Sequence, residues 1–141
     1  MIKTLFGERK AFHEVKETLQ ILRESGIEYA IGSTTDTDSL LYFLKENDLF
    51  FERIYTSENM KVYKPEKKFY ETILEMSGWN VNECLFIGDN LVDDVAGPQS
   101  IGMKAILIDR DGKYIESEAA IRPDYVIHSL MDIQRILYEI S

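Results

Sequence analysis

Hydrophobic residues along this chain follow two spacings, one typical of buried strands and one typical of helices. Short, almost wholly apolar runs predict strands at residues 27–31, 53–56, 84–87, 104–108 and 125–127. Apolar residues three or four positions apart, with Gly, Pro or capping residues at the ends, predict helices at residues 12–23, 37–45, 65–76, 95–101 and 131–138. Residues 1–6 are short, apolar and ambiguous.

Regular alternation of strands and helices predicts a parallel sheet covered by helices on both faces. The fold class is therefore α/β, a three-layer α/β/α Rossmann-like sandwich. Neither repeats nor an interdomain linker interrupt the 141 residues, which predicts a single core domain.

The composition and charge of the chain argue against several classes of function. With 45% hydrophobic and 29% charged residues, the chain resembles an ordinary globular protein. Its net charge of −9 argues against nucleic acid or an anionic membrane as a partner. The single cysteine, Cys84, excludes an internal disulfide or a cysteine-based zinc cluster. No apolar run approaches the ~18 residues that span a bilayer, and we expect a cytoplasmic protein.

The strongest chemical signal follows the apolar run at residues 84–87. Gly88 and Asp89 end that run, and Asp93 and Asp94 come directly after it. Such closely spaced carboxylates repel one another unless a cation lies among them, and oxygen ligands suit Mg²⁺. The alternative is that these acids only favour the positive N-terminus of the following helix. That explanation does not account for Asp89, which sits on the strand end.

Two further polar positions lie beside predicted elements, where their side chains can bind an anion. Ser33 or Thr34 follows the strand at residues 27–31, where a hydroxyl and loop amides can hydrogen-bond a phosphate oxygen. Lys64 precedes Pro65, so its ammonium can reach an anion held over the sheet. A hydroxyl, a cation and a metal-binding acid group together can hold a phosphoryl group and its Mg²⁺.

This combination resembles the haloacid dehalogenase (HAD) superfamily over about residues 12–112. The segments that carry the resemblance are Ile31-Gly32-Ser33-Thr34, Lys64-Pro65, and Gly88-Asp89-Asn90-Leu91-Val92-Asp93-Asp94 with its flank through Gly102-Met103. They look like the second, third and fourth motifs of that superfamily.

The resemblance implies a HAD-like core with Mg²⁺ as cofactor and a small phosphorylated substrate. Ser33 would hydrogen-bond the transferring phosphoryl group, with Thr34 as the substitute, and Lys64 would neutralise its charge. Asp89 would ligate Mg²⁺, while Asp93 or Asp94 would bind the ion directly or through water.

The family's first motif, which supplies the aspartate nucleophile and the general acid, is not recognisable. Residues 1–32 contain no aspartate. In one interpretation, residues 1–11 end a cap domain and a preceding segment carries the central strand with its nucleophile. In the other, residues 2–6 are the central strand, and Gly7 and Arg9 stand where two aspartates belong. A sheet that lacks its central strand could be completed by a strand from another subunit, which would favour a homo-oligomer.

Asp36-Thr37-Asp38 imitates the missing motif, with Asp36 as nucleophile and Asp38 as general acid. It begins several residues beyond the apolar run, however, and would leave no separate hydroxyl motif before Lys64. The simpler interpretation makes Asp36 the cap of a helix.

Three functional hypotheses follow. The first is a Mg²⁺-dependent HAD-type phosphatase of a small phosphorylated metabolite, with its nucleophile apparently outside this chain. The second is a non-catalytic HAD-like module that binds phosphate and Mg²⁺, and its mark would be a real strand at residues 2–6 that ends in Gly7. The third is a receiver-like signalling domain, which is disfavoured because Lys64 precedes Asp89.

Overall fold

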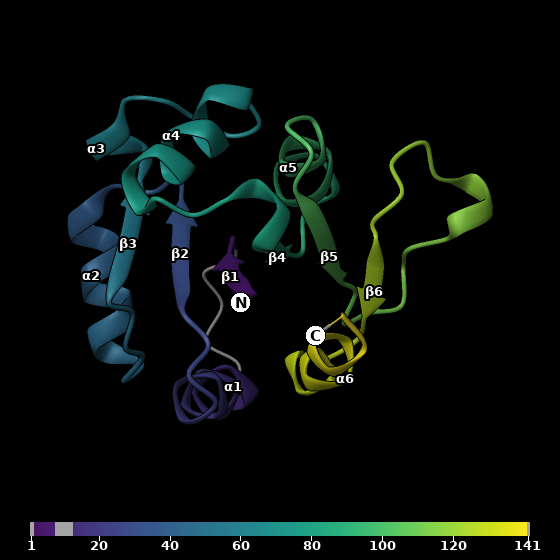
Figure 1. The fold of residues 1–141 in the computed structure, drawn as a ribbon, viewed down its shortest axis with the longest axis horizontal. Coiled ribbons are helices and arrows are strands. Elements are labelled where there is room, and N and C mark those ends of the chain that lie inside the picture. The colour runs from purple at the N-terminus through teal and green to yellow at the C-terminus, as the bar shows by residue number, and fades with distance from the viewer. Residues whose placement is uncertain (1, 8–12, 141) are drawn as a thin grey trace.

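A six-stranded parallel sheet forms the centre of the molecule. The computed structural model describes residues 2–7 and 13–140, and the strands lie in the order β3-β2-β1-β4-β5-β6 (Figure 1). The strands are β1 (Lys3–Phe6), β2 (Tyr29–Ser33), β3 (Arg53–Thr56), β4 (Cys84–Gly88), β5 (Lys104–Ile108) and β6 (Tyr125–Ile127). All five neighbouring pairs are parallel, which confirms the predicted α/β fold class.

Helices connect successive strands and cover the sheet. They are α1 (His13–Glu24), α2 (Thr37–Glu46), α3 (Ser57–Met60), α4 (Lys67–Ser77), α5 (Gly97–Gln99) and α6 (Ile133–Ile140). Short turns of other helical types are η1 (Val81–Glu83), η2 (Leu91–Ala96, a π-helix), η3 (Glu116–Glu118) and η4 (Leu130–Asp132). Most predicted elements therefore exist within one to three residues of their expected bounds, the range in which helix ends usually vary.

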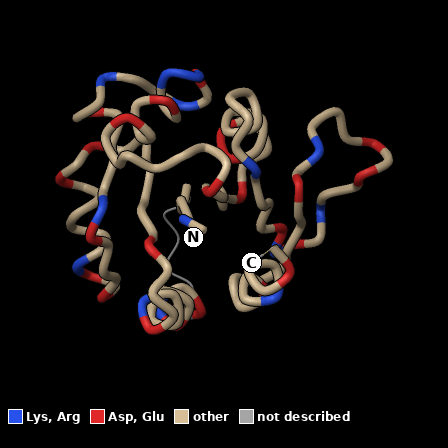
Figure 2. Tube along the Cα trace, viewed as in Figure 1, with Lys and Arg blue, Asp and Glu red and all other residues tan. Residues whose placement is uncertain are grey.

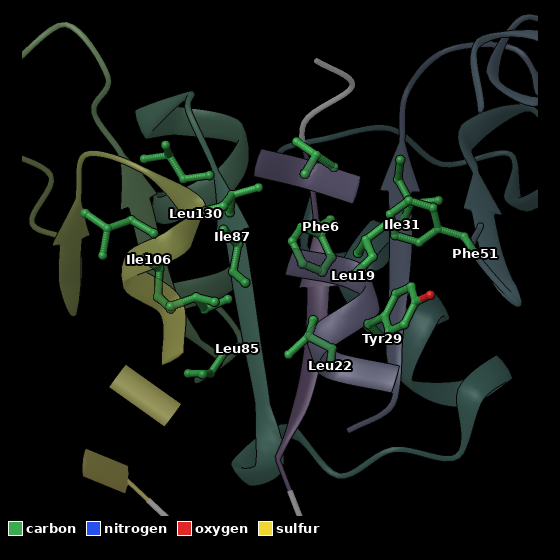
Figure 3. Packing of buried hydrophobic residues seen from close by; sticks show 14 of the residues in the cluster. Phe6, Leu19, Leu22, Tyr29, Ile31, Phe51, Leu85, Ile87, Ile106 and Leu130 are labelled. Carbon is green, nitrogen blue, oxygen red and sulfur yellow. The ribbon is translucent and has the colours of Figure 1, made fainter. Parts of the chain in front are cut away.

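Successive strand residues point to opposite faces of the sheet and build two different cores. Leu85 and Ile87 of β4 pack with Leu19 of α1 in an aliphatic core, part of which Figure 3 shows. Phe86 points the other way, into an aromatic core with Tyr70 of α4. Both faces are thus buried, as the continuous apolar runs in the sequence predicted.

The ambiguous segment at the start of the chain is the central strand. Lys3 lies opposite Cys84, and Phe6 lies between Ile31 and Ile87. Leu5 and Phe6 are buried on opposite faces. The interpretation that these residues end a cap domain is therefore wrong for residues 3–6, because burial on both faces ties them into the sheet. Residues 8–11 of that expected segment lie outside the described residues.

The predicted helix start at Pro65 is also wrong. The Lys64–Pro65 peptide bond is cis, and α4 begins only at Lys67. The N–H of Glu66 donates to the carbonyl oxygen of Tyr63, so these residues form a turn instead of the first turn of the helix. Lys64 is placed by this turn.

Charged residues lie mainly on the helices and loops, while the middle of the sheet is nearly free of them (Figure 2). Within residues 2–7 and 13–140, none of the helices combines the length and the hydrophobicity that crossing a bilayer requires.

Candidate functional site

Three neighbouring strands bring the sequence-predicted residues to one edge of the sheet. β2 ends at Ser33, β1 is followed by Gly7, and β4 is followed by Asp89, while β1 lies between the other two strands. The N–H of Gly7 donates to the carbonyl oxygen of Ile87 at 2.7 Å, which continues the β1–β4 pairing to this edge. Carboxyl ends of parallel strands are where open α/β sheets bind ligands.

Lys64 reaches into the centre of this edge. Its Nζ donates to the carbonyl oxygen of Gly7 at 2.9 Å and to Oδ1 of Asp94 at 3.0 Å. Only 4% of the Lys64 side chain and 3% of the Asp94 side chain are exposed. The ammonium also lies 5.3 Å from the centre of the Phe86 ring, a distance at which the face of an aromatic ring attracts a cation.

Asp94 is held by several groups at once. Its Oδ2 accepts from the N–H of Asn90 at 3.1 Å, while Oδ1 receives Lys64. Burial raises the pKa of Asp94, and the neighbouring Lys64 opposes that rise. A Cβ on Gly7 or on Gly88 would overlap the Asp94 carboxylate, so both positions need glycine for this carboxylate to lie under the sheet edge.

The segment after β4 presents the other two acids nearer the surface. The side chain of Asn90 accepts from the N–H groups of Val92 and Asp93 and thereby caps the π-helix η2. The hydroxyl of buried Tyr70 donates to the carbonyl oxygen of Asp93. Asp89 and Asp93 are half-buried, unlike Asp94. The predicted helix at residues 95–101 is thus a π-helix followed by the short α5.

At the end of β2, the two candidate hydroxyls differ. Ser33 is buried, and its Oγ accepts from the N–H of Thr35 at 3.1 Å, whereas Thr34 is exposed. Asp36 accepts from the N–H of Ser39 and caps α2. Its position matches the simpler interpretation made from the sequence, that of a helix cap.

A metal ion would depend on the carboxylates near β4. Among the described residues, no group of three or more His, Cys, Asp or Glu side chains is arranged to hold a metal ion. Mg²⁺ commonly needs only one or two protein carboxylates, because it keeps water and takes phosphate oxygens from its substrate. Asp89 and Asp93 suit that donor set, while both oxygens of Asp94 already accept protein hydrogen bonds.

Sequence analysis missed a second part of this edge. A pocket of about 350 Å³ is lined by Asp89 together with residues to which the sequence assigned no role: Asp109, Arg110, Asp111, Lys113 and Tyr114. Sequence analysis also gave Tyr70 no role beside the site. Nothing in the spacing of residues 109–114 distinguishes a pocket wall from an ordinary solvated turn, so the sequence held no signal for it. Arg9, expected where a second aspartate belongs, lies outside the described residues.

Comparison with known proteins identifies the family. The profile described as haloacid dehalogenase-like hydrolase matches residues 3–108. Glyceraldehyde 3-phosphate phosphatase of Pyrococcus furiosus is 30% identical over 128 residues, which cover 86% of this chain and 52% of the relative. Pyrophosphatase PpaX of Bacillus mycoides is 29% identical, covering 92% and 61%. The chain belongs to the haloacid dehalogenase-like hydrolase family and spans about half to three-fifths of these relatives' length.

Solved structures agree on the fold. A HAD phosphatase from Thermococcus onnurineus superposes with a TM-score of 0.79 at 30% identity, covering 89% of this chain and 57% of that one. An uncharacterised protein from Listeria monocytogenes serotype 4b superposes with a TM-score of 0.82 at 19% identity, covering 99% and 98%. That second similarity shows the fold alone.

Proposed function

We propose that this chain is the phosphate- and Mg²⁺-binding core of a HAD-type phosphatase that acts on a small phosphorylated metabolite. The observation that carries the proposal is the convergence of Ser33, Lys64 and Asp89 on one sheet edge, from three separate segments. Family membership and relatives named as phosphatases support it.

Each residue would have a separate task. Lys64 fixes positive charge at the end of the central strand, where a phosphoryl group would lie, and its buried partners hold it there before any ligand arrives. Ser33 and the amides after it would hydrogen-bond phosphoryl oxygens, with Thr34 at the exposed side. Asp89 and Asp93 would hold Mg²⁺, which when bound offsets the negative charge of the phosphoryl oxygens.

A second candidate function is binding without hydrolysis. A real strand at Lys3–Phe6 is followed by Gly7, which has no side chain to attack phosphorus, and Lys64 donates to the carbonyl oxygen of Gly7. Phosphoryl transfer through a covalent intermediate needs a nucleophilic side chain, and the resemblance to the family implies a carboxylate at this position. Asp36, the other candidate nucleophile, caps α2 and accepts a hydrogen bond from the N–H of Ser39. These observations favour a regulatory or binding module that keeps the family's phosphate site.

One experiment separates the two functions. Hydrolysis of p-nitrophenyl phosphate is measured with and without Mg²⁺, and binding of Mg²⁺ and of inorganic phosphate is measured by calorimetry on the same protein. Asp89→Asn removes the proposed metal ligand, and Asp48→Asn, at an exposed carboxylate after α2, is the matched control. Mg²⁺-dependent turnover lost only in Asp89→Asn supports the phosphatase. Asp89-dependent binding without turnover supports the binding module, and the absence of both activities contradicts both functions.

A further inference from the structure

The pocket beside Asp89 lies next to the proposed phosphate site, on the far side of β4 from the central strand. Asp89 lines it at one end, and the turn after β5 lines it at the other. Leu91, Leu107 and Tyr114 supply apolar surface within it. Because β4 and β5 are neighbours in the sheet, a ligand held by its phosphate over β1 and β4 can extend over the end of β5 without leaving the edge.

The wall of this pocket is fixed before any ligand binds. Oδ1 and Oδ2 of Asp109 accept from the N–H groups of Lys113 and Tyr114 at 3.0 and 2.9 Å. The N–H of Asp109 donates to the carbonyl oxygen of Ile127 at 2.7 Å, which joins the turn to β6. Gly112 takes a positive φ of 67°, so the turn suits glycine there. The Tyr114 hydroxyl donates to the carbonyl oxygen of Ile121 at 3.2 Å, which holds the ring in place.

The charges around the pocket are largely matched within the protein. Arg110 pairs with the buried carboxylate of Glu14 in α1 at 3.2 Å. The carboxylate of Asp109 is already hydrogen-bonded to two backbone N–H groups, and Asp111 lies 4.0 Å from Lys113. Figure 2 shows acidic and basic residues together along the β5–β6 connection. The pocket therefore offers apolar surface without an excess of positive charge, which would be needed to favour a second anionic group.

We infer that this pocket, lined by Leu91, Leu107 and Tyr114, holds the uncharged organic part of the phosphorylated ligand and selects short uncharged carbon chains. The inference rests on the proposed function, because the phosphate must lie at the Ser33–Lys64 edge for its organic part to reach Tyr114. A volume of about 350 Å³ is near the lower end of small-molecule pockets, so it suits a chain of a few carbons better than a nucleoside. Tyr114 is thus a specificity-determining residue that lines the pocket without belonging to the proposed phosphate site.

Binding by calorimetry in the presence of Mg²⁺ tests the inference with three probes: inorganic phosphate, glycerol 3-phosphate and 3-phosphoglycerate. The last two share three carbons and differ in a carboxylate. We expect glycerol 3-phosphate to bind about tenfold more tightly than inorganic phosphate because its carbons enter the pocket. We expect it to bind about threefold more tightly than 3-phosphoglycerate, because the added carboxylate gains no unpaired cation and lies near Asp89 and Asp111.

Two variants locate the effect. Tyr114→Ala removes the ring, and Leu91→Trp fills the pocket from the opposite wall; Tyr42→Ala, at an exposed tyrosine of α2, is the control. Thermal unfolding shows whether each variant is folded. Both pocket variants should reduce the affinity for glycerol 3-phosphate to that for inorganic phosphate and leave the affinity for inorganic phosphate unchanged.

The outcomes distinguish a failure of the pocket inference from a failure of the proposed function. If inorganic phosphate binds but glycerol 3-phosphate gains nothing, or if folded pocket variants weaken all probes equally, the pocket inference is overturned and the proposed function stands. If the wild-type chain binds none of the three probes, the proposed function fails and the inference fails with it.

Discussion

The two faces of the sheet are both buried but perform different tasks. The aliphatic face packs Leu19 of α1 and Ile133 of α6 against the strands. The aromatic face packs Phe69 and Tyr70 of α4 against Phe86, and the same three rings lie beneath Lys64 or the segment that carries Asp93. The aliphatic face holds the sheet together, whereas the aromatic face also positions the candidate site. Burial of a face therefore does not by itself determine its influence on ligand binding.

The largest expected effect is on the aromatic side, where a charge is buried. Lys64→Met removes the ammonium and leaves Asp94 buried without its partner, which should lower the free energy of unfolding by about 3–5 kcal/mol. Burial already raises the pKa of Asp94, and loss of Lys64 raises that pKa further. A raised pKa in the folded state means that stability is lost as the pH rises. Urea unfolding should therefore show a smaller deficit at pH 5 than at pH 8.

A double variant is the control for this prediction. Lys64→Met with Asp94→Asn removes both charges, and it should recover part of the lost free energy of unfolding at pH 8. If the double variant is as unstable as the single one, the buried carboxylate is not the cause.

A smaller effect separates the two faces directly. Leu19→Ala opens a cavity on the aliphatic face and should cost about 2–5 kcal/mol of unfolding free energy, with the affinity of the folded protein for phosphate unchanged. Phe69→Leu is its counterpart on the aromatic face, 5.8 Å from the Lys64 ammonium, and should weaken phosphate binding as well as stability. Unfolding and calorimetry on both variants measure this. Equal loss of affinity in the two would remove the distinction between the faces.

The smallest effect compares two matched hydroxyls. Tyr70→Phe removes the donor to the carbonyl oxygen of Asp93. Tyr29→Phe on the aliphatic face removes the donor to the carbonyl oxygen of Phe50 and the acceptor of the Arg23 guanidinium. Each should cost about 1 kcal/mol of unfolding free energy. Only Tyr70→Phe should also weaken Mg²⁺ binding, because it releases the segment that carries Asp93. If titration with Mg²⁺ gives identical affinities for the two variants, Tyr70 supports the core alone.

How far the sequence predicts the structure depends on the kind of contact. The continuous apolar runs at β4 and β5 are buried on both faces, so their pattern predicts the strands and the fold class correctly, while the family follows from the motifs beside them. Residues 2–6 remained ambiguous, because a strand of four residues is too short to show a period. Their place in the sheet is decided only by pairing with β2 and β4, far along the chain.

The site shows the same limit. That Ser33 and Asp89 lie at one edge follows from the ends of two parallel strands, whereas Lys64 is placed there by the turn before α4. The roles of all three residues remain a prediction. The different environments of Asp94 and Asp89 do not follow from their neighbouring positions, since Asp94 is buried by Gly7 and Gly88 in three dimensions. Equally, the wall made by Tyr114 depends on hydrogen bonds to Asp109 and Ile121 that local sequence does not reveal.

The central position of β1 has a consequence for biosynthesis. On a ribosome, Lys3–Phe6 emerges before either of its neighbours, and its partner strand β4 is complete only once Gly88 has been made. Pairings between distant segments form slowly, and an apolar strand waiting for a partner is prone to aggregation. Translation speed and chaperone access before Gly88 emerges should therefore govern the yield of folded protein more than events later in synthesis.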